Sequence, residues 1–349
     1  MKHILFISPG FADGISDSKC IPCLQQFALH LSKTPGIKIS ILSLEYPFEE
    51  KEYDWNGITV YACGGKNRSW PLKSFNLKNA LQKIKKINSD RKIDLINSFW
   101  FQDTALLGNF FCKRNEIPHV VTLMGQDVLA GNKYLRFFKN VSAKFICLSP
   151  FQQAVFKKNS GQHAEVIPLG IDEKEFGELN TGPRAIDVLG AGGLSPVKQF
   201  NHFIEVIGLV KEKNPSIKAV LIGDGSEKEN LLALTKKMGL QNNILFTGAL
   251  ERDLVLEYMQ KSKILLHTSS FESFGYVFTE ALASGMKIVS YPVGIATEAS
   301  INKAGNNIHE LSEIISFTLK TELSPEKSIP FPIGETIRKY CSLYRSLLN

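Results

Sequence analysis

Short apolar runs alternate along the chain with segments in which apolar residues recur every three or four positions. Runs of four to eight apolar residues are typical of buried strands, and the longer spacing is typical of helices with one buried face. The strands predicted in the first half span residues 4–8, 37–44, 58–63, 94–98, 120–123, 145–149 and 166–169. Leu77, Leu81, Ile84 and Ile87 mark a basic amphipathic helix between two of these strands.

The same alternation begins again at residue 187. The strands predicted there span residues 187–191, 219–222, 244–246, 264–267 and 287–290, and the helices span 200–213, 227–238, 254–260 and 276–284. Strands that alternate with helices form parallel sheets covered on both faces. The expected fold class is therefore α/β, with two Rossmann-like, doubly wound domains.

The predicted domain boundaries fall where the composition changes. Residues 170–184 are rich in Gly, Asp, Glu, Asn, Thr and Pro, which indicates a linker between a domain at 1–169 and a domain at 185–334. A last helical pattern at 335–349 follows a Pro-rich loop. Ligands of doubly wound sheets bind at the carboxyl ends of the strands, so we expect the site in a cleft between two facing sheets.

The composition agrees with two folded domains. The chain has 349 residues, of which 44% are hydrophobic and 21% are charged. These values exclude a mostly disordered, collagen-like or coiled-coil chain. No apolar run reaches the roughly 18 residues that span a bilayer, and the run at the start is too short for a signal peptide. We therefore expect a cytoplasmic protein.

Positive charge is concentrated in the first half. The net charge is +7, and residues 66–92 hold nine basic side chains against Asp90 alone. Such a stretch attracts nucleic acid, anionic lipid or an acidic substrate, although it also fits a solvated helix face. Nucleic acid is the weakest of these partners, because the chain carries no recognised nucleic-acid motif. An anionic membrane surface that binds Lys66–Lys92, with Trp70 nearby, is the expected partner.

Cys20 and Cys23 form a Cys-x-x-Cys pair, which is compatible with a redox or metal site. No second pair lies at zinc-site spacing, and no thioredoxin-like context surrounds it. We therefore favour a loop-to-helix junction that carries two thiols.

Glycine-rich turns follow three successive strands of the second half. Gly192 and Gly193 follow the first strand, Gly223 and Gly225 the second, and the third ends in Phe-Thr-Gly-Ala-Leu250. Glycines let a ligand approach the backbone, and turns at one sheet edge suggest a nucleotide-sized groove. Lys198 enters the following helix, where a phosphate would meet free N–H groups, although it also fits an exposed helix-start lysine.

The strongest local signal lies at residues 267–285. Glu272 precedes a turn of Ser273, Phe274 and Gly275, so the N–H groups of the following helix are free to receive a diphosphate. Glu280 lies two turns along, where a carboxylate can accept hydrogen bonds from both hydroxyls of a ribose diol.

These motifs resemble the family 4 retaining glycosyltransferases of GT-B fold. The resemblance rests on Gly-Gly-Leu-Ser-Pro-Val-Lys at 192–198, Ile-Gly-Asp-Gly-Ser-Glu at 222–227, the two glutamates and Val-Gly-Ile-Ala-Thr-Glu at 293–298. In the first half, residues 94–100, 117–127, 147–150 and 166–172 look like strands and turns of the family's acceptor domain. The C-terminal helix resembles the one that packs back on that domain.

The resemblance implies a nucleotide-sugar donor and a glycan or lipid-linked acceptor, with a role in cell-envelope polysaccharide synthesis at the inner membrane face. Lys198 would neutralise the leaving diphosphate, and Glu272 would bind hydroxyls of the transferred sugar. Glu280 would bind the ribose. The remaining donor-binding residues would be Gly192, Gly193, Gly223, Gly225, Leu250, Phe274 and Gly275. No Asp-x-Asp occurs in the chain, so neither a metal nor another cofactor is expected.

The acceptor side implied by the resemblance comprises Gly10, Gly14, Met124 and Asp127. The sequence departs from the family in four places: the loop at 9–14 lacks the family's paired glycines, the segment after Glu298 is shorter, and two implied site positions carry other residues. Gly193 stands where the family has Arg, and Met124 stands where it has His. A nucleotide-sugar epimerase of the same architecture, or a non-catalytic nucleotide-sugar or polysaccharide binder, is the alternative function.

Overall fold

The computed structural model describes residues 1–69, 72–137, 141–179, 181–298, 303–321 and 324–348. It divides the chain into two compact units. The first comprises Met1–Gly170 together with Ile333–Asn349, and the second comprises Ile171–Pro332.

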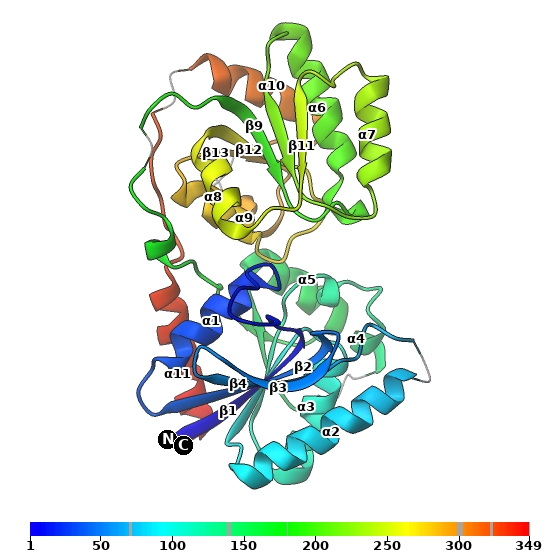
Figure 1. Cartoon of the computed structure of the whole chain (residues 1–349), viewed down its shortest axis with the longest axis vertical. Coiled ribbons are helices and arrows are strands. Elements are labelled where there is room, and N and C mark those ends of the chain that lie inside the picture. The colour runs from blue at the N-terminus through cyan, green and yellow to red at the C-terminus, as the bar shows by residue number, and fades with distance from the viewer. Residues whose placement is uncertain (70–71, 138–140, 180, 299–302, 322–323, 349) are drawn as a thin grey trace. The chain divides into compact units, whose positions relative to one another are not determined.

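The first unit is built on an eight-stranded sheet (Figure 1). Its order is β3-β4-β2-β1-β5-β6-β7-β8. The strands are β1 (Lys2–Gly10), β2 (Ile37–Tyr46), β3 (Glu50–Trp55), β4 (Ile58–Cys63), β5 (Leu95–Phe99), β6 (His119–Thr122), β7 (Lys144–Cys147) and β8 (Ala164–Val166). The seven strands predicted from the apolar runs are confirmed, with bounds shifted by a few residues, and all seven pair in parallel.

Strand β3 was not predicted, and it makes the first sheet mixed. It pairs antiparallel with β4, from Glu50 opposite Cys63 to Trp55 opposite Ile58. The strand is polar because it lies at the sheet edge, where only Trp55 is buried. Asn56 and Gly57 form the turn at φ 50° and 81°. An Asn-Gly pair is a strong hairpin signal, so this strand could have been found from the sequence.

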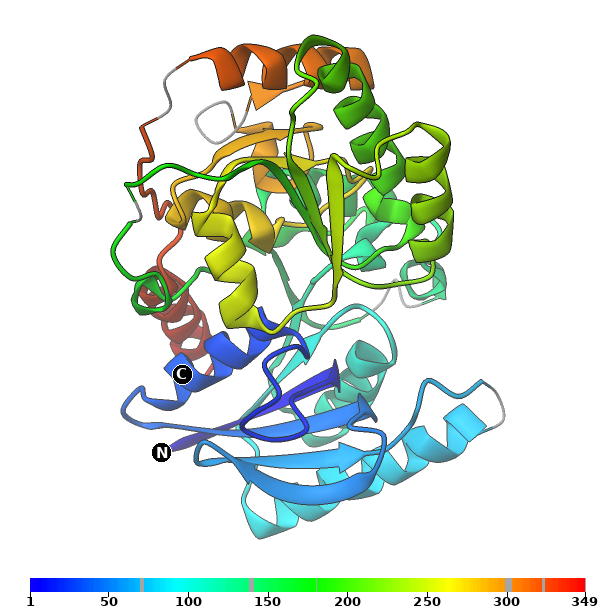
Figure 2. The same cartoon turned by 45° about the horizontal axis from the view of Figure 1, so that its top comes forward.

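Helices cover both faces of this sheet (Figures 1 and 2). Its helices are α1 (Pro22–Ser32), α2 (Leu72–Asp90), α3 (Asp103–Asn115), α4 (Lys133–Phe137), α5 (Pro150–Ser160) and α11 (Ile333–Leu348). Helices α1 and α11 lie together on one face, and α2 and α3 lie on the other. Helix α2 buries Ile84 and Ile87 in a cluster with Leu5 and Leu42, so its apolar stripe faces the core as expected.

Helix α11 completes the core of the first unit although it comes last in the chain. Tyr340 is fully buried, with its ring centroid 4.5 Å from that of Phe27. The Tyr340 hydroxyl lies 2.9 Å from Thr122 Oγ1, which itself donates to Asn97 Oδ1. Tyr340 therefore donates to Thr122, and its hydroxyl is satisfied in the core.

We expect Tyr340→Phe to lower the free energy of unfolding by about 1 kcal/mol, through loss of one buried hydrogen bond. Tyr340→Ala also leaves a cavity, so it should lower the free energy by about 3–5 kcal/mol. Urea unfolding followed by tryptophan fluorescence measures both variants. All three tryptophans (Trp55, Trp70 and Trp100) belong to the first unit's stretch of the sequence, so the signal reports that unit. If the two variants lower the free energy of unfolding equally, the packing of the Tyr340 ring in the core is contradicted.

The second unit is built on a six-stranded sheet in which all pairs are parallel. Its order is β11-β10-β9-β12-β13-β14. The strands are β9 (Ile186–Ala191), β10 (Ala219–Ile222), β11 (Ile244–Gly248), β12 (Ser262–His267), β13 (Lys287–Ser290) and β14 (Lys303–Ala304). The helices are α6 (Phe200–Lys213), α7 (Lys228–Lys237), α8 (Arg252–Gln260), α9 (Tyr276–Ala283) and α10 (Ile308–Lys320).

Helix α10 and strand β14 are additions to the predicted pattern. Helix α10 begins after Asn307, whose side chain accepts from the Glu310 N–H and caps the first turn. It buries Leu311 and Ile315 in the core that contains Phe203. Ile308, Leu311 and Ile315 recur at helical spacing, so the sequence carried this signal.

The segment expected as a linker is held in the second unit. Ile171 forms a bridge with Pro332, and the buried Arg184 donates to the carbonyls of Ser262 and Ser284 at 2.5 and 2.7 Å. Arg184 therefore ties the end of this segment to β12 and to the residue after α9. Among the described residues, no helix combines the length and hydrophobicity needed to cross a bilayer.

Candidate active site

Three glycine turns lie side by side at the carboxyl edge of the second sheet, on adjacent strands β9, β10 and β11. The Gly192 N–H donates to the Ile222 carbonyl and the Gly223 N–H to the Gly248 carbonyl, both at 3.0 Å. A Cβ on Gly223 would lie 1.9 Å from the Gly192 carbonyl oxygen, so only glycine fits there. A Cβ on Gly225 would lie 2.4 Å from the Leu194 carbonyl oxygen. The turns expected from the sequence thus form one rim, with the half-buried Leu250 beyond β11.

Lys198 and Glu272 meet at this rim. Lys198 ends a 3₁₀ turn after β9, and its Nζ lies 2.5 Å from Glu272 Oε1. His267, the last residue of β12, places its Nε2 2.8 Å from the same oxygen. Hydrogen bonds from the Thr268 hydroxyl to the Lys198 and Gln199 carbonyls fix the two loops together. One carboxylate is therefore held by two nitrogen donors.

The pKa values define the charges of this cluster. Burial disfavours ionisation of Glu272, but the hydrogen bond from His267 and the Lys198 charge outweigh it and lower the Glu272 pKa to about 2. Burial lowers the pKa of His267 despite the nearby carboxylate. His267 is therefore neutral and donates from Nε2, and its buried Nδ1 has no partner among the described residues. The cluster presents one cation and one anion at the rim.

The turn before α9 lies next to this cluster. Gly275 has φ 84°, and a Cβ there would lie 2.3 Å from the Phe278 ring. The Ile295 N–H donates to the Phe274 carbonyl at 3.0 Å. The N–H groups of Phe274 and Gly275 have no acceptor within the described ranges. They remain available to an anion at the helix N-terminus.

Glu280 lies in α9 beside a second buried ion cluster. Arg252, the first residue of α8, donates from one terminal nitrogen to Glu280 and from the other to Glu175 at 2.8 Å. The guanidinium also lies 5.8 Å from the centre of the Tyr276 ring. Burial raises the pKa of Glu280 although Arg252 opposes the shift. The carboxylate expected to bind ribose is thus already fixed by an arginine.

We expect Arg252→Ala to lower the free energy of unfolding by about 3–5 kcal/mol, since it leaves two carboxylates unpaired. The loss should be larger at pH 8 than at pH 5. Burial raises the pKa of Glu280 above its unfolded value, so between these two pKa values the folded unit binds more protons than the unfolded chain, and stability falls as pH rises through that window. Without Arg252 this pKa rises further. Urea unfolding followed by circular dichroism at both pH values measures the effect.

The matched control is Lys261→Ala, which removes an exposed cation from its pair with Glu257. Exposed pairs contribute about 0.2–1 kcal/mol, so this variant should change stability little at either pH. Equal losses in the two variants would contradict a structural role for the Arg252 cluster.

Arg252, Glu175 and His267 were not among the residues expected at the site. Arg252 follows Leu250 by two residues, and His267 ends a predicted strand, so their positions were visible in the sequence. The pairing of Arg252 with Glu175 was not visible in the sequence, because these two residues are far apart along the chain. Only the folded second unit brings them together.

The residues expected on the acceptor side lie in the first unit. Asp127 is buried, and its two oxygens accept the N–H groups of Phe101 and Gly125 at 2.7 and 2.8 Å. Its carboxylate therefore braces the loop after β6, and burial raises its pKa despite these bonds. Met124 is 9% exposed. Gly10 ends β1, and a Cβ on Gly14 would meet no described atom within 4 Å.

Cys20 and Cys23 are half-buried thiols at the start of α1, and neither forms a disulfide. Burial, together with the charge of Asp17, raises the pKa of Cys20 to about 12. The thiol is therefore protonated at neutral pH, which does not favour redox reactivity. The described residues hold no group of three or more His, Cys, Asp or Glu side chains arranged for a metal ion.

Comparisons with protein families identify the class of protein to which the chain is similar. The family model "Glycosyl transferases group 1" matches residues 172–328, and "Glycosyl transferase 4-like" matches residues 21–156. An uncharacterised glycosyltransferase of Methanocaldococcus jannaschii is 27% identical over 270 residues, which cover 72% of this chain and 74% of that protein. Both halves of the chain are thus matched by glycosyltransferase family models, and the protein is a glycosyltransferase.

Solved structures confirm the fold class. Sucrose-phosphate synthase from Thermosynechococcus elongatus matches with a TM-score of 0.83 and 16% identity, over 99% of both chains. HepE of Anabaena, solved with UDP and glucose, matches with a TM-score of 0.74 and 18% identity, over 99% of this chain and all of that one. The two Rossmann-like sheets are therefore those of a GT-B glycosyltransferase.

Proposed function

We propose that the protein is a retaining glycosyltransferase that moves a sugar from a nucleotide-sugar donor to a glycan or lipid-linked acceptor. The observation that carries this proposal is the Lys198–Glu272 pair beside the unbonded N–H groups of Phe274 and Gly275. A cation and a helix N-terminus at one point suit a diphosphate, and a carboxylate beside them suits sugar hydroxyls. Synthesis of cell-envelope polysaccharide is the process we propose for it.

In the proposed reaction, the bond between the anomeric carbon and the diphosphate oxygen breaks as a bond to the acceptor hydroxyl oxygen forms. The acceptor proton passes to the leaving phosphate on the same face, so the configuration is retained. Lys198 Nζ and the N–H groups before α9 stabilise the charge that develops on the diphosphate. Glu272, ionised and held by His267, accepts hydrogen bonds from the transferred sugar.

Glu280 is the proposed ribose ligand. Arg252 binds Glu280 Oε1, so the second oxygen is left to accept from a ribose hydroxyl. The structure of HepE with UDP and glucose supports a uridine donor for this chain as well. Positive charge from Lys198 and the backbone leads us to propose a donor site that needs no metal.

We expect UDP to bind with the same affinity in EDTA as in Mg²⁺ or Mn²⁺, since protein groups supply the positive field. Isothermal titration calorimetry measures this. Glu280→Ala should weaken UDP binding, and Glu272→Ala should leave it within a few-fold while impairing transfer. An absolute metal requirement would contradict the proposed site, and the opposite behaviour of the two glutamates would reverse their roles.

We expect Lys198→Ala to lower the turnover number by about 10²–10³, the effect of losing one preorganised charge-stabilising group. Release of UDP in the presence of a glycan acceptor measures it, and an epimerised donor without transfer would support the epimerase alternative.

Gly193→Arg is the matched variant for Lys198→Ala, because it adds a positive charge at the same rim. A Cβ on Gly193 would meet no described atom within 4 Å, so the side chain can be accommodated. This variant should bind UDP more tightly than the parent. If neither Gly193→Arg nor Lys198→Ala changes the affinity for UDP, the diphosphate binds elsewhere.

We further propose that the acceptor lies at an anionic membrane surface that contacts Lys66–Lys92. The support is weaker than the sequence implied, because Lys73, Lys83 and Lys86 pair with Asp103, Glu50 and Glu52. Lys66, Arg68, Lys78, Lys85, Arg91 and Lys92 are the basic residues that carry this proposal. Trp70 lies outside the described residues.

A further inference from the structure

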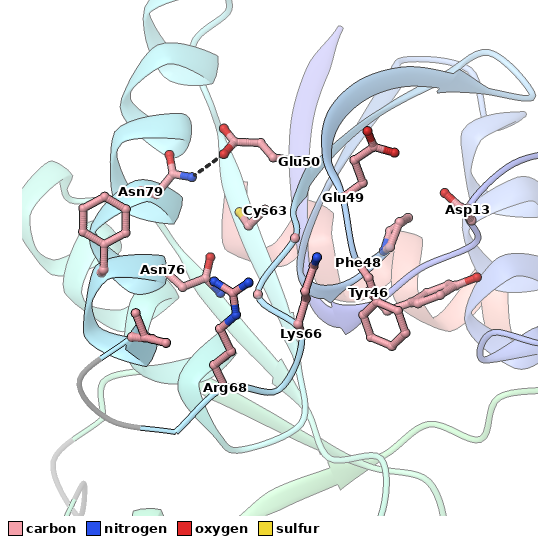
Figure 3. Close-up of a pocket in the computed structure, with 15 residues that line it drawn as sticks. Asp13, Tyr46, Phe48, Glu49, Glu50, Cys63, Lys66, Arg68, Asn76 and Asn79 are labelled. Carbon is pink, nitrogen blue, oxygen red and sulfur yellow. Dashed lines mark hydrogen bonds between the residues drawn. The ribbon is translucent and has the colours of Figure 1, made fainter.

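A cavity of about 690 Å³ opens in the first unit. Its walls are the connection from β2 to β3, the loop after β4, and the first turns of α2 (Figure 3). All these segments follow the carboxyl ends of β2 and β4. None of the residues implied for the acceptor side (Gly10, Gly14, Met124 and Asp127) and none of the donor-binding residues lines it, although Lys66 and Arg68 also belong to the basic stretch proposed to contact the membrane.

Two cations in this cavity have no side-chain partner among the described residues. Lys66 and Arg68 extend from the loop after β4 into the space between α2 and the β2–β3 connection (Figure 3). Asp13 and Glu50 also line the cavity, but Lys51 and Lys83 neutralise them. Glu49 is the remaining carboxylate of the lining, and in Figure 3 it points away from Arg68. The cavity therefore offers positive charge that the protein itself does not use.

The loop that carries these cations has an unusual backbone. Gly64, Lys66 and Asn67 have φ values of 65°, 60° and 52°. Two of them carry a Cβ, which this conformation disfavours, and such strain clusters at ligand sites. A Cβ on Gly65 would lie 2.2 Å from Asn76 Nδ2, so the loop passes directly against α2.

Hydrogen bonds to β2 hold the strained loop in place. The N–H groups of Gly65 and Lys66 donate to the carbonyls of Leu44 and Glu45 at 3.0 and 3.1 Å. The Asn67 N–H donates to Glu45 Oε2 at 2.7 Å. The fold thus fixes the backbone from which Lys66 and Arg68 extend.

The rest of the lining is mixed. Phe48, Leu72 and Phe75 are 52%, 54% and 74% exposed, which is unusual for large apolar side chains. Asn76 and Asn79 use their amide N–H₂ groups on Leu44 and Glu50, so their carbonyl oxygens remain as acceptors for hydroxyls. A ligand that fits this lining has an anionic group, hydroxyls and an apolar or ring-shaped face.

We propose that this cavity binds a phosphate ester, with the phosphate on Lys66 and Arg68 and the organic group against Phe48, Leu72 and Phe75. Inorganic phosphate would leave most of the volume and the apolar wall unused. That this ester belongs to the acceptor rests on the proposed glycosyl transfer. The binding itself does not depend on it.

The test uses the full chain and two phosphate esters of different origin. Glucose 6-phosphate, measured by calorimetry, represents a freely diffusing ester. Phosphatidylcholine vesicles with 20 mol% phosphatidate (a composition chosen for this test), measured by co-sedimentation, represent a lipid phosphate. Glucose and pure phosphatidylcholine vesicles are the neutral counterparts. We expect at least one phosphate probe to bind and both neutral probes to bind at least tenfold more weakly.

The variant is Lys66→Asn with Arg68→Gln. Asparagine adopts positive φ more readily than lysine, so the loop should keep its conformation while the charge is lost. We expect the affinity for the phosphate probe to fall tenfold or more. Lys78→Gln with Lys85→Gln removes the same charge from α2 outside the cavity, and it should change the affinity for glucose 6-phosphate less than threefold. Both lysines belong to the basic stretch proposed to contact the membrane, so this variant should weaken vesicle binding, but less than Lys66→Asn with Arg68→Gln does. The urea midpoint by tryptophan fluorescence verifies that both variants are folded.

Binding of glucose 6-phosphate alone identifies a freely diffusing ester, and binding of the phosphatidate vesicles alone identifies a lipid phosphate. Either result supports the proposal. Absence of binding to both probes, equal binding of the neutral probes, or an equal effect of the two double variants overturns it. UDP affinity, measured in the same samples, should be unchanged in both variants. If the unmodified chain does not bind UDP, the proposed donor site is refuted, but the assignment of the cavity still stands.

Discussion

The second unit depends on holding buried carboxylates in charged pairs at one edge of its sheet. Glu272 and Glu280 each have an exposed fraction of 14% or less in their side chains, so ionisation without a partner would be strongly unfavourable. Lys198 and Arg252 supply the partners, and His267 adds a neutral donor to Glu272. These pairs also set the chemistry, because they keep one oxygen of each carboxylate occupied and leave the other for a ligand.

The two clusters differ in a way that matches two roles. Around Glu272, donors outweigh burial and the pKa falls, so the carboxylate stays ionised under all physiological conditions. Around Glu280, burial outweighs Arg252 and the pKa rises. A hydroxyl donor from a bound ribose would favour the ionised form of Glu280. Ligand binding and the charge state of Glu280 are therefore coupled, whereas Glu272 is preorganised before any ligand arrives.

The sequence predicted the strands and helices, which depend on local patterns. It did not predict ion pairs between residues that are far apart along the chain. Apolar runs located seven strands of the first sheet and five of the second, and the block from Glu272 to Glu280 located the N-terminus of α9. Arg252 was missed because its partner Glu175 lies in a segment that read as a linker. The polar strand β3 was missed because an edge strand buries one face only in part, although Asn56-Gly57 marked its turn.

The basic stretch of the first unit also shows that ion pairs between distant residues are not visible in the sequence. The sequence suggested a basic stretch opposed by a single acid, but β3 brings Glu50 and Glu52 against α2 and neutralises two of its lysines. The connection from β2 to β3 also forms a wall of the cavity in which Lys66 and Arg68 have no side-chain partner among the described residues. A strand that the apolar pattern did not indicate therefore decides which cations coat the surface and which remain for a ligand. Net charge along a sequence becomes a binding property only after tertiary pairing has removed the charges that the fold itself uses.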